Sequence, residues 1–460
     1  MKLVKFLAAF GLVLLVGGCA RTAPAPETTK VDIAVRHAGE GVWRLSYRLS
    51  TPAEALRFGR PVGDFRAQDW TIETPGAHLA TDQESETVVS DTGRFSALEI
   101  TVREKAIAVE KDYAPFYPFS DGGALFYVGH FIPDVIRGAA AAPALARFEF
   151  FASRGESVLV FDRRGARVAY EMDADMSPFF AYFGTSPVIQ TETVAAIVDP
   201  EIPDWIDDAL QGFIPRLFTY YRDAFGTKLP RKPNIFLASA FAERRDGYSF
   251  HGDALPGQFQ VTLAGEGWRK PSKTGLDLLA FHVAHEAAHL WQNLAQPIDG
   301  NQPEWIHEGG ADAVAAEALV ALGLWTDARA TEDFDKAATT CAQSLEAGAL
   351  SGAGRRGDYR ALYACGRVIA VAVARAEGEG TRVAGFWAAF IERARGAGGY
   401  SDALFFDLAE ERSGRPEFAR ALRRFAQTPF AEPEREVSGF LVFAAGPDGE
   451  PFPLEPDAAR

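Results

Sequence analysis

Cysteine is nearly missing from this chain: Cys19, Cys341 and Cys365 are the only three among 460 residues. Zinc sites built on thiolates need several cysteines at short spacing, so three scattered thiols exclude that kind of site. A disulfide between Cys341 and Cys365 requires Cα atoms within about 7 Å of each other. The sequence does not show that separation, and it leaves open whether the two cysteines pair.

Positive charge is also scarce. The formal net charge is −15, and no cluster of Lys and Arg offsets it. Binding to a phosphate backbone needs a basic face, so we expect no nucleic acid among the partners. The hydrophobic fraction of 47% and the charged fraction of 24% are those of an ordinary globular protein.

Long apolar runs are absent after the N-terminus. A membrane-spanning helix needs about 20 apolar residues in a row, and only the opening segment comes near, with the sequence MKLVKFLAAFGLVLLVGG. Its two lysines, apolar stretch and final small residues are typical of a secretory signal peptide, and the following Cys19 resembles the cysteine of a bacterial lipobox. We predict a signal peptide at 1–18 and a lipid-modified Cys19 that anchors the chain to a bilayer of the bacterial cell envelope, facing the periplasm or the outside. Plain secretion with an incidental cysteine is the alternative.

The rest of the chain changes character once. Residues 19–30, rich in Ala, Pro and Thr, are predicted to be a tether. From 31 to 188, short segments rich in β-branched and aromatic residues are separated by Gly, Pro and Asp, which predicts an antiparallel β domain of the sandwich type. From 189 to 430 helical spacing dominates, and residues 431–460 are predicted to be a C-terminal tail. The fold class is therefore α+β, with a β domain followed by a mainly helical domain.

A cluster of three histidines and a glutamate lies at 281–293, where the sequence is FHVAHEAAHLWQN. This segment falls within a predicted helix at 275–296, where His285 and His289 project from one face at the separation that two zinc ligands need. Glu286 beside them can reach a metal-bound water. The pattern H-E-x-x-H alone also occurs by chance in proteins that bind no metal.

A second predicted helix, at 303–322, adds an oxygen ligand. Eighteen residues separate His289 from Glu308, and two antiparallel helices joined by a short loop would bring Glu308 over the histidine pair. The result is an open His/His/Glu site for one Zn²⁺. Asp312, one turn further along the same face, is placed to accept the second N–H of a ligating histidine. His282 shares the histidine face, but Glu308 completes the site without it, so we interpret His282 as a neighbouring polar residue.

These two segments, HEAAHLW and WIHEGGAD, resemble the aminopeptidase N family of zinc peptidases, the gluzincins. In that family H-E-x-x-H is followed after eighteen residues by a glutamate within W-L-x-E-G. The segment YACG at 363–366 is similar to the family's Y-E-K-G, and the order of a β domain before a thermolysin-like catalytic domain is similar over residues 31–430. The glycyl aminopeptidase family, which has a similar architecture, is a close alternative.

The resemblance implies a role for each residue of the motif. It implies zinc held by His285, His289 and Glu308, a general base in Glu286, and a hydrogen bond from Tyr363 to the oxyanion of the reaction. The chemistry of these residue types supports the same roles. Tyr359 is a nearby competitor for the part played by Tyr363.

One family feature is changed here. The family recognises the free amine of its substrate with a glutamate in G-x-M-E-N, on an edge strand before the zinc helix. The corresponding segment by our interpretation is GQFQV, at the start of a predicted strand at 257–265, which makes Gly257 and Gln260 the substrate-binding residues. Gln260 then occupies the place of the glutamate, and an amide lacks the charge that anchors an ammonium group. Asp253 and Glu266 are candidates to replace that charge.

Two functions from different classes remain. The first is a membrane-tethered zinc metallopeptidase acting on peptide or protein substrates, as an exopeptidase or an endopeptidase. The second is a non-catalytic binding or scaffold protein that retains the fold. An intact Glu286 favours the peptidase, because a structural zinc ion has no use for a general base. Gln260 is the feature that favours the scaffold.

Overall fold

The structure is a computed structural model that describes residues 29–446, apart from 60, 83–84, 108, 110–111, 174–175, 243–244, 296–302 and 379. The predicted signal peptide and Cys19 lie outside the described residues. Among the residues that are described, no helix combines the length and the apolar character needed to cross a membrane.

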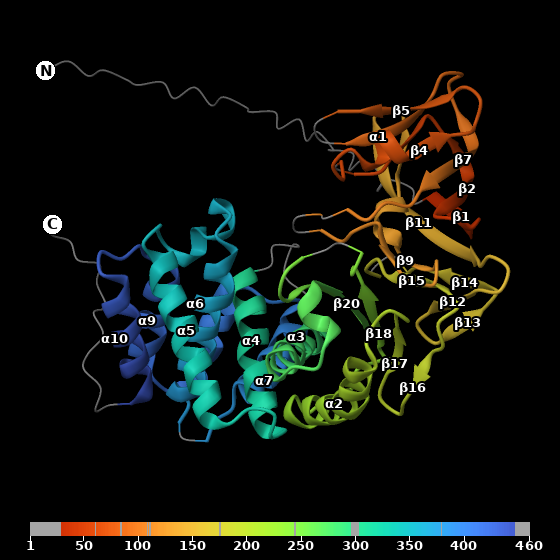
Figure 1. Cartoon of the computed structure of the whole chain (residues 1–460). Helices are drawn as coiled ribbons and strands as arrows, with labels where there is room; N and C mark the ends of the chain where they lie inside the picture. The colour runs from red at the N-terminus through yellow and green to blue at the C-terminus, as the bar shows by residue number, and fades with distance from the viewer. Residues whose placement is uncertain are drawn as a thin grey trace, which may run out of the picture.

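The N-terminal part is a β-sandwich of two sheets (Figure 1). The larger sheet has the order β4 (Trp70–Ile72), β7 (Phe95–Arg103), β2 (Val42–Ala53), β1 (Thr29–His37), β11 (Ala140–Phe151), β10 (Asp134–Arg137), β3 (Ala55–Arg57), β6 (Glu86–Ser90) and β5 (Ala77–Thr81), with β14 (Arg167–Glu171) also paired to β11. The smaller sheet has the order β13 (Arg163–Gly165), β12 (Ser157–Val160), β15 (Phe180–Gly184), β9 (Ala124–Tyr127) and β8 (Phe116–Pro118). Short helical segments α1 (Phe65–Asp69) and η1 (Val128–Phe131) join some of the strands.

The two sheets share one core, as their alternating sequences predict. Val31, Ile33 and Val35 of β1 are fully buried while the residues between them face outward, the period of two that a half-buried strand requires. Their cluster includes Phe126 and Val158 from the smaller sheet. The predicted sandwich is therefore present, although β1 and β11 run parallel to each other, unlike the antiparallel pairs around them.

A third sheet stands between the sandwich and the helices (Figure 1). Its order is β16 (Ile189–Gln190), β17 (Ala195–Val198), β18 (Asn234–Ser239), β20 (Gln258–Ala264) and β19 (Ser249–Leu255), the last being antiparallel to β20 and at the edge. Phe180 and Tyr182 from the sandwich pack against Phe236 of this sheet. The side-chain amide of Gln258 accepts a hydrogen bond from the backbone N–H of Phe180 at 2.7 Å and donates one to its carbonyl at 2.9 Å. Apolar packing and paired hydrogen bonds thus join the two domains.

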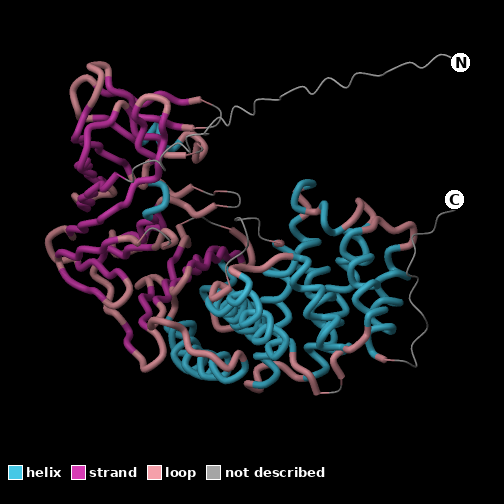
Figure 2. The backbone as a smooth tube through the Cα atoms, turned by 180° about the vertical axis from the view of Figure 1, so that it is seen from behind, coloured by secondary structure: helices cyan, strands magenta, loops and turns pink. Residues whose placement is uncertain are grey.

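The remaining chain is helical, as the cyan segments of Figure 2 show. The helices are α2 (Asp204–Ala224), α3 (Lys273–Gln292), α4 (Glu304–Ala321), α5 (Asp327–Leu345), α6 (Tyr359–Ala376), α7 (Val383–Ala397), α8 (Asp402–Ser413), α9 (Pro416–Gln427) and α10 (Pro433–Ala445), with 3-10 turns η2 (Glu266–Arg269), η4 (Leu350–Gly352) and η5 (Gly354–Arg356). Helix α10 falls within the predicted tail at 431–460, but its Val437 and Phe440 are buried in the main helical core. The helical domain therefore continues past residue 430.

Glycines and a disulfide fix the position of α6. A side chain at Gly309 of α4 would overlap the backbone of Gly366, and one at Gly366 would overlap the carbonyl oxygen of Trp305, so α4 and α6 approach each other as closely as they do because both positions lack a Cβ. One residue before Gly366, Cys365 forms a disulfide with Cys341 of α5, with a Cα–Cα distance of 4.7 Å. The structure thereby answers the question that the sequence left open.

Candidate metal centre and its cleft

Helix α3 presents the two histidines of the H-E-x-x-H pattern. It begins at Lys273, because the hydroxyl of Ser272 accepts a hydrogen bond from the backbone N–H of Gly275 at 3.0 Å and so caps the first turn. The predicted start at 275 was two residues late, and α3 ends at Gln292. His285 and His289 are each 5% exposed.

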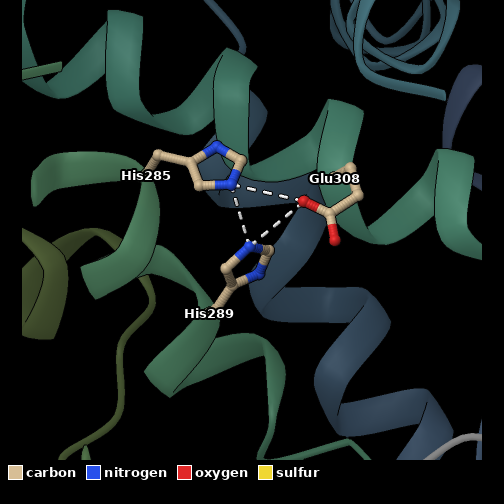
Figure 3. Close-up of side chains that lie close together, drawn as sticks. All are labelled: His285, His289 and Glu308. Atoms are coloured by element: carbon tan, nitrogen blue, oxygen red, sulfur yellow. Dashed lines mark hydrogen bonds and ion pairs between the residues drawn. The ribbon is translucent and has the colours of Figure 1, made fainter. Parts of the chain in front are cut away.

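Three ligand atoms converge between α3 and α4 (Figure 3). The Nε2 atoms of His285 and His289 lie 3.3 and 3.4 Å from Oε2 of Glu308 and 3.0 Å from each other. Four atoms at tetrahedral corners, each about 2.1 Å from a zinc ion, would be about 3.4 Å apart, so the spacing fits zinc. Among the described residues these three form the group that could hold a metal. His282 is outside the group, as interpreted from the sequence.

Charges within the group keep the third ligand ionised. Burial raises the pKa of Glu308, but the neighbouring His289 and His285 outweigh that effect and hold it well below its usual range. A carboxylate that remains deprotonated is ready to bind a cation.

Both histidines are oriented by hydrogen bonds to their second ring nitrogens. Nδ1 of His285 donates to Oδ1 of Asp312 at 2.8 Å, the role predicted for Asp312. Nδ1 of His289 donates to Oε1 of Gln292 at 2.6 Å, and Gln292 in turn donates to the carbonyl of His307 at 3.0 Å. Each bond leaves Nε2 free to face a metal. Gln292 was missed in the sequence, because an amide three residues after His289 shows its role only through this hydrogen bond.

Glu286 borders the same cleft. Its side chain is buried, and this burial is the main cause that raises its pKa to about 7. A Cβ on Gly252 of the edge strand β19 would overlap both Oε1 of Glu286 and Nε2 of His282, so a glycine is required where β19 passes the glutamate. A carboxylate with a pKa near neutrality is suited to accept and return a proton.

Tyr363 lies over the metal-binding group. Its ring stacks on the ring of His285 at a centroid distance of 5.8 Å, and the side chain is 39% exposed. Burial, helped by the charges of Glu308 and Glu286, raises the pKa of Tyr363 above its usual range, so its phenol stays protonated and can donate a hydrogen bond. Tyr359 lines the same cleft but does not stack on His285 in the described geometry.

The opposite wall of the cleft consists of β19 and a segment of the β-sandwich. The cleft has a volume of about 590 Å³, and its lining includes Asp112, Tyr113 and residues 251–254 together with the metal-binding group. Gly257 and Gln260, predicted to bind substrate, are not part of this lining. Gln260 is fully buried, and Gly257 sits at a turn with a positive φ of 81° facing Arg231.

Of the two carboxylates predicted to replace the missing charge, Asp253 is the one that lines the cleft. In the β19–β20 pairing it lies opposite Gln260, whose Nε2 donates to its Oδ2 at 2.6 Å. The same oxygen is 3.1 Å from Nε2 of His251 and accepts a hydrogen bond from the hydroxyl of Tyr117. Glu266, the other candidate, pairs with Arg269 at 3.1 Å and is not in the cleft lining. Gln260 thus supports a carboxylate on the neighbouring strand.

Comparisons with known proteins place the fold. No protein-family model matches the chain, and no curated protein matches its sequence. Among solved structures, an aminopeptidase N family protein from Idiomarina loihiensis has a TM-score of 0.65 at 11% identity, covering 89% of this chain and 78% of that one. A zinc metallopeptidase mutant from Deinococcus radiodurans, described as bound to a Tyr-Ser-Ala substrate, has a TM-score of 0.51 at 15% identity, covering 88% of this chain and 94% of that one. This chain therefore has the fold of the aminopeptidase N-like zinc metallopeptidases, with a β-rich N-terminal domain followed by a helical one.

Proposed function

We propose that this protein is a zinc metallopeptidase that removes residues from the free N-terminus of peptides. The observation that carries the proposal is the convergence of His285, His289 and Glu308, with the buried Glu286 beside them in one cleft. A binding protein with a structural zinc would need the three ligands but no additional acid-base group. The fold of the structural neighbours supports the same reaction class.

Residues of α3, α4 and α6 form the helical wall of the cleft, and each would have a different role in the reaction. A zinc ion held by the three ligands would supply a Lewis acid for the scissile carbonyl and for water. Glu286 takes a proton from the attacking water and delivers it to the leaving amine, which its pKa of about 7 allows in both directions. The protonated phenol of Tyr363 donates to the oxygen on which negative charge develops.

The strand wall would bind and select the substrate. β19 is the edge strand of its sheet, and an extended peptide can add to such an edge through backbone hydrogen bonds. Asp253 supplies a carboxylate within the cleft, and a carboxylate attracts an α-ammonium group. It therefore replaces the charge that Gln260 lacks, and this is why we favour exopeptidase over endopeptidase action.

The decisive experiment compares zinc-loaded wild type with Glu286→Gln on pairs of peptides that differ only in an acetyl group on the N-terminus. Mass spectrometry should find residues lost from the free peptides, little cleavage of the acetylated ones, and a loss of about 10²- to 10⁴-fold in the variant with its zinc content unchanged. Internal cuts in acetylated peptides would indicate an endopeptidase. Absence of cleavage by the wild type would contradict the proposal and favour a binding protein.

We also propose that Cys19 carries the lipid that anchors the chain to the cell envelope. The proposal rests on the order of charged, apolar and small residues before Cys19. Wild-type protein from a bacterial host should partition into detergent and show a lipid-modified N-terminal peptide by mass spectrometry. Cys19→Ser should be found in the aqueous phase, and equal partition of the two proteins would contradict the anchor.

A further inference from the structure

Three side chains hold a single oxygen of Asp253. Gln260 donates to Oδ2 from the neighbouring strand, His251 approaches the same atom from two residues away, and the hydroxyl of Tyr117 reaches it from the β-sandwich. No hydrogen bond from the described residues goes to Oδ1. The described residues therefore hold the carboxylate through Oδ2 alone.

Tyr117 differs from the other two side chains because it belongs to another domain. It lies on β8 and is 6% exposed, and its hydroxyl oxygen accepts a hydrogen bond from the backbone N–H of Ala114 at 3.0 Å. That bond occupies an acceptor position of the phenol and leaves its proton for Asp253. Burial also raises the pKa of Tyr117 well above its usual range, so the phenol remains a donor throughout the working range of pH.

The segment that carries Tyr117 is attached to β19 at two successive residues. Tyr117 reaches the side chain of Asp253, and the hydroxyl of Tyr113 donates to the carbonyl of Ala254 at 3.0 Å. From inside the sandwich, Nε2 of His130 donates to the carbonyl of Tyr113 at 2.5 Å. The segment is thus held on both sides, toward the strand wall and toward the core of its own domain.

We infer that Tyr117 is a positioning residue through which the β-sandwich sets the orientation of Asp253, and hence the selectivity of the cleft for substrates with a free amine. The inference rests on the proposed function, because it assigns amine recognition to Asp253. Its consequence is that selectivity depends on a hydrogen bond across the domain interface, whereas the chemical step depends on the helices alone. Loss of the hydroxyl frees the carboxylate to rotate, so binding should weaken while the catalytic rate changes little.

The test compares Tyr117→Phe with Tyr182→Phe. Tyr182 is a matched control because it is a buried tyrosine of the same interdomain cluster and its hydroxyl also donates to a carboxylate, Oδ2 of Asp121 at 3.3 Å, which is not in the cleft lining. In Tyr117→Phe, KM for a free-amine peptide should rise about 10- to 100-fold, with kcat within about 3-fold and zinc content unchanged. KM for an acetylated peptide should hardly change. Tyr182→Phe should alter KM for neither peptide.

Binding measurements separate this inference from the proposed function. On a Glu286→Gln background, calorimetry gives the ratio of the Kd for the acetylated peptide to the Kd for the free peptide, which measures the amine preference without any need for turnover. Tyr117→Phe should lower that ratio, and combining it with Asp253→Asn should lower it no further than Asp253→Asn alone. Additive effects of the two substitutions, or an equal loss of affinity for both peptides in Tyr117→Phe, would overturn the inference. So would an absence of amine preference in the protein that carries Glu286→Gln alone. Amine-selective binding without hydrolysis by the wild type would contradict only the proposed function.

Discussion

The cleft has two walls that are built in different ways. The helical wall holds His285, His289 and Glu308 on α3 and α4, two helices that follow each other in the sequence. The strand wall holds Asp253 on β19, where its position depends on the pairing of two strands and on Tyr117 from another domain. The metal-binding group is thus encoded locally, while recognition is assembled from segments far apart in the sequence.

Removing a ligand from the helical wall has the largest expected effect. His289→Ala leaves two of the three ligand atoms, so zinc should be lost and peptide hydrolysis should fall by about 10³-fold or more. Elemental analysis of the purified protein and initial rates measure the two quantities. Asp253→Asn is the control on the strand wall and should retain zinc. Loss of zinc from both variants would contradict the division into a metal-binding wall and a recognition wall.

The helical wall was largely predictable because helix geometry leaves little freedom. Side chains four residues apart on a helix share a face, so His285 and His289 could be paired without a structure, and Asp312 lies one turn from Glu308 for the same reason. Gln292 was not predicted, because an amide becomes visible as a support only when its hydrogen bond to His289 is known.

The strand wall was predicted less well for physical reasons. The strand at 257–265 was recognised by its alternating apolar residues, but its neighbour β19 reads SFHGDAL, with Gly and Asp, which have low β-propensity. Without β19 the edge of the sheet cannot be located, and Gln260 appeared to be the residue facing substrate. A shift of one strand toward the interior changes Gln260 from a binding residue into the support of Asp253.

The supports of the two ligating histidines offer the next largest effect. Asp312→Asn removes the charge behind His285, and Gln292→Leu removes the amide behind His289; such changes weaken metal binding by about 10- to 100-fold. Zinc affinity measured by competition with a chelator should fall in both variants, while the free-amine preference of the zinc-saturated proteins stays at the wild-type value. A changed preference would show that the two walls are not independent.

Gln260→Glu tests the strand wall directly. If Gln260 simply replaced a glutamate that binds the amine, this variant would gain aminopeptidase activity. The structure leads us to expect the reverse, because position 260 is fully buried with its side chain 2.6 Å from Asp253, and a second carboxylate there would repel the first.

The expected result of Gln260→Glu is a loss of about 3 to 5 kcal/mol in the free energy of unfolding at pH 8 and about 10-fold in kcat/KM for free-amine peptides. The new carboxyl would have a raised pKa in the folded state, so its penalty is absent at low pH and grows as the pH rises above the pKa of the unfolded chain. Urea titrations of the variant and wild type at pH 5 and pH 8 should therefore diverge. Gln260→Asn, which keeps the amide, is the neutral control.

The smallest effect on recognition is expected from the disulfide behind the helical wall. Cys341 and Cys365 are both fully buried and separated by 24 positions in the sequence, so closing that loop in the unfolded chain is worth about 3 kcal/mol. Cys341→Ser combined with Cys365→Ser should lower the midpoint of urea unfolding accordingly.

Because Cys365 is on the same helix as Tyr363, kcat should fall modestly, by about 2- to 5-fold if the phenol loses its alignment. The ratio of kcat/KM for free and acetylated peptides should not change, because the side chains that hold Asp253 make no hydrogen bond or ion pair with α5 or α6 among the described residues. A changed ratio would mean that strain in the helices reaches β19, and the independence of the two walls would then be wrong even if every residue role proposed for them were right.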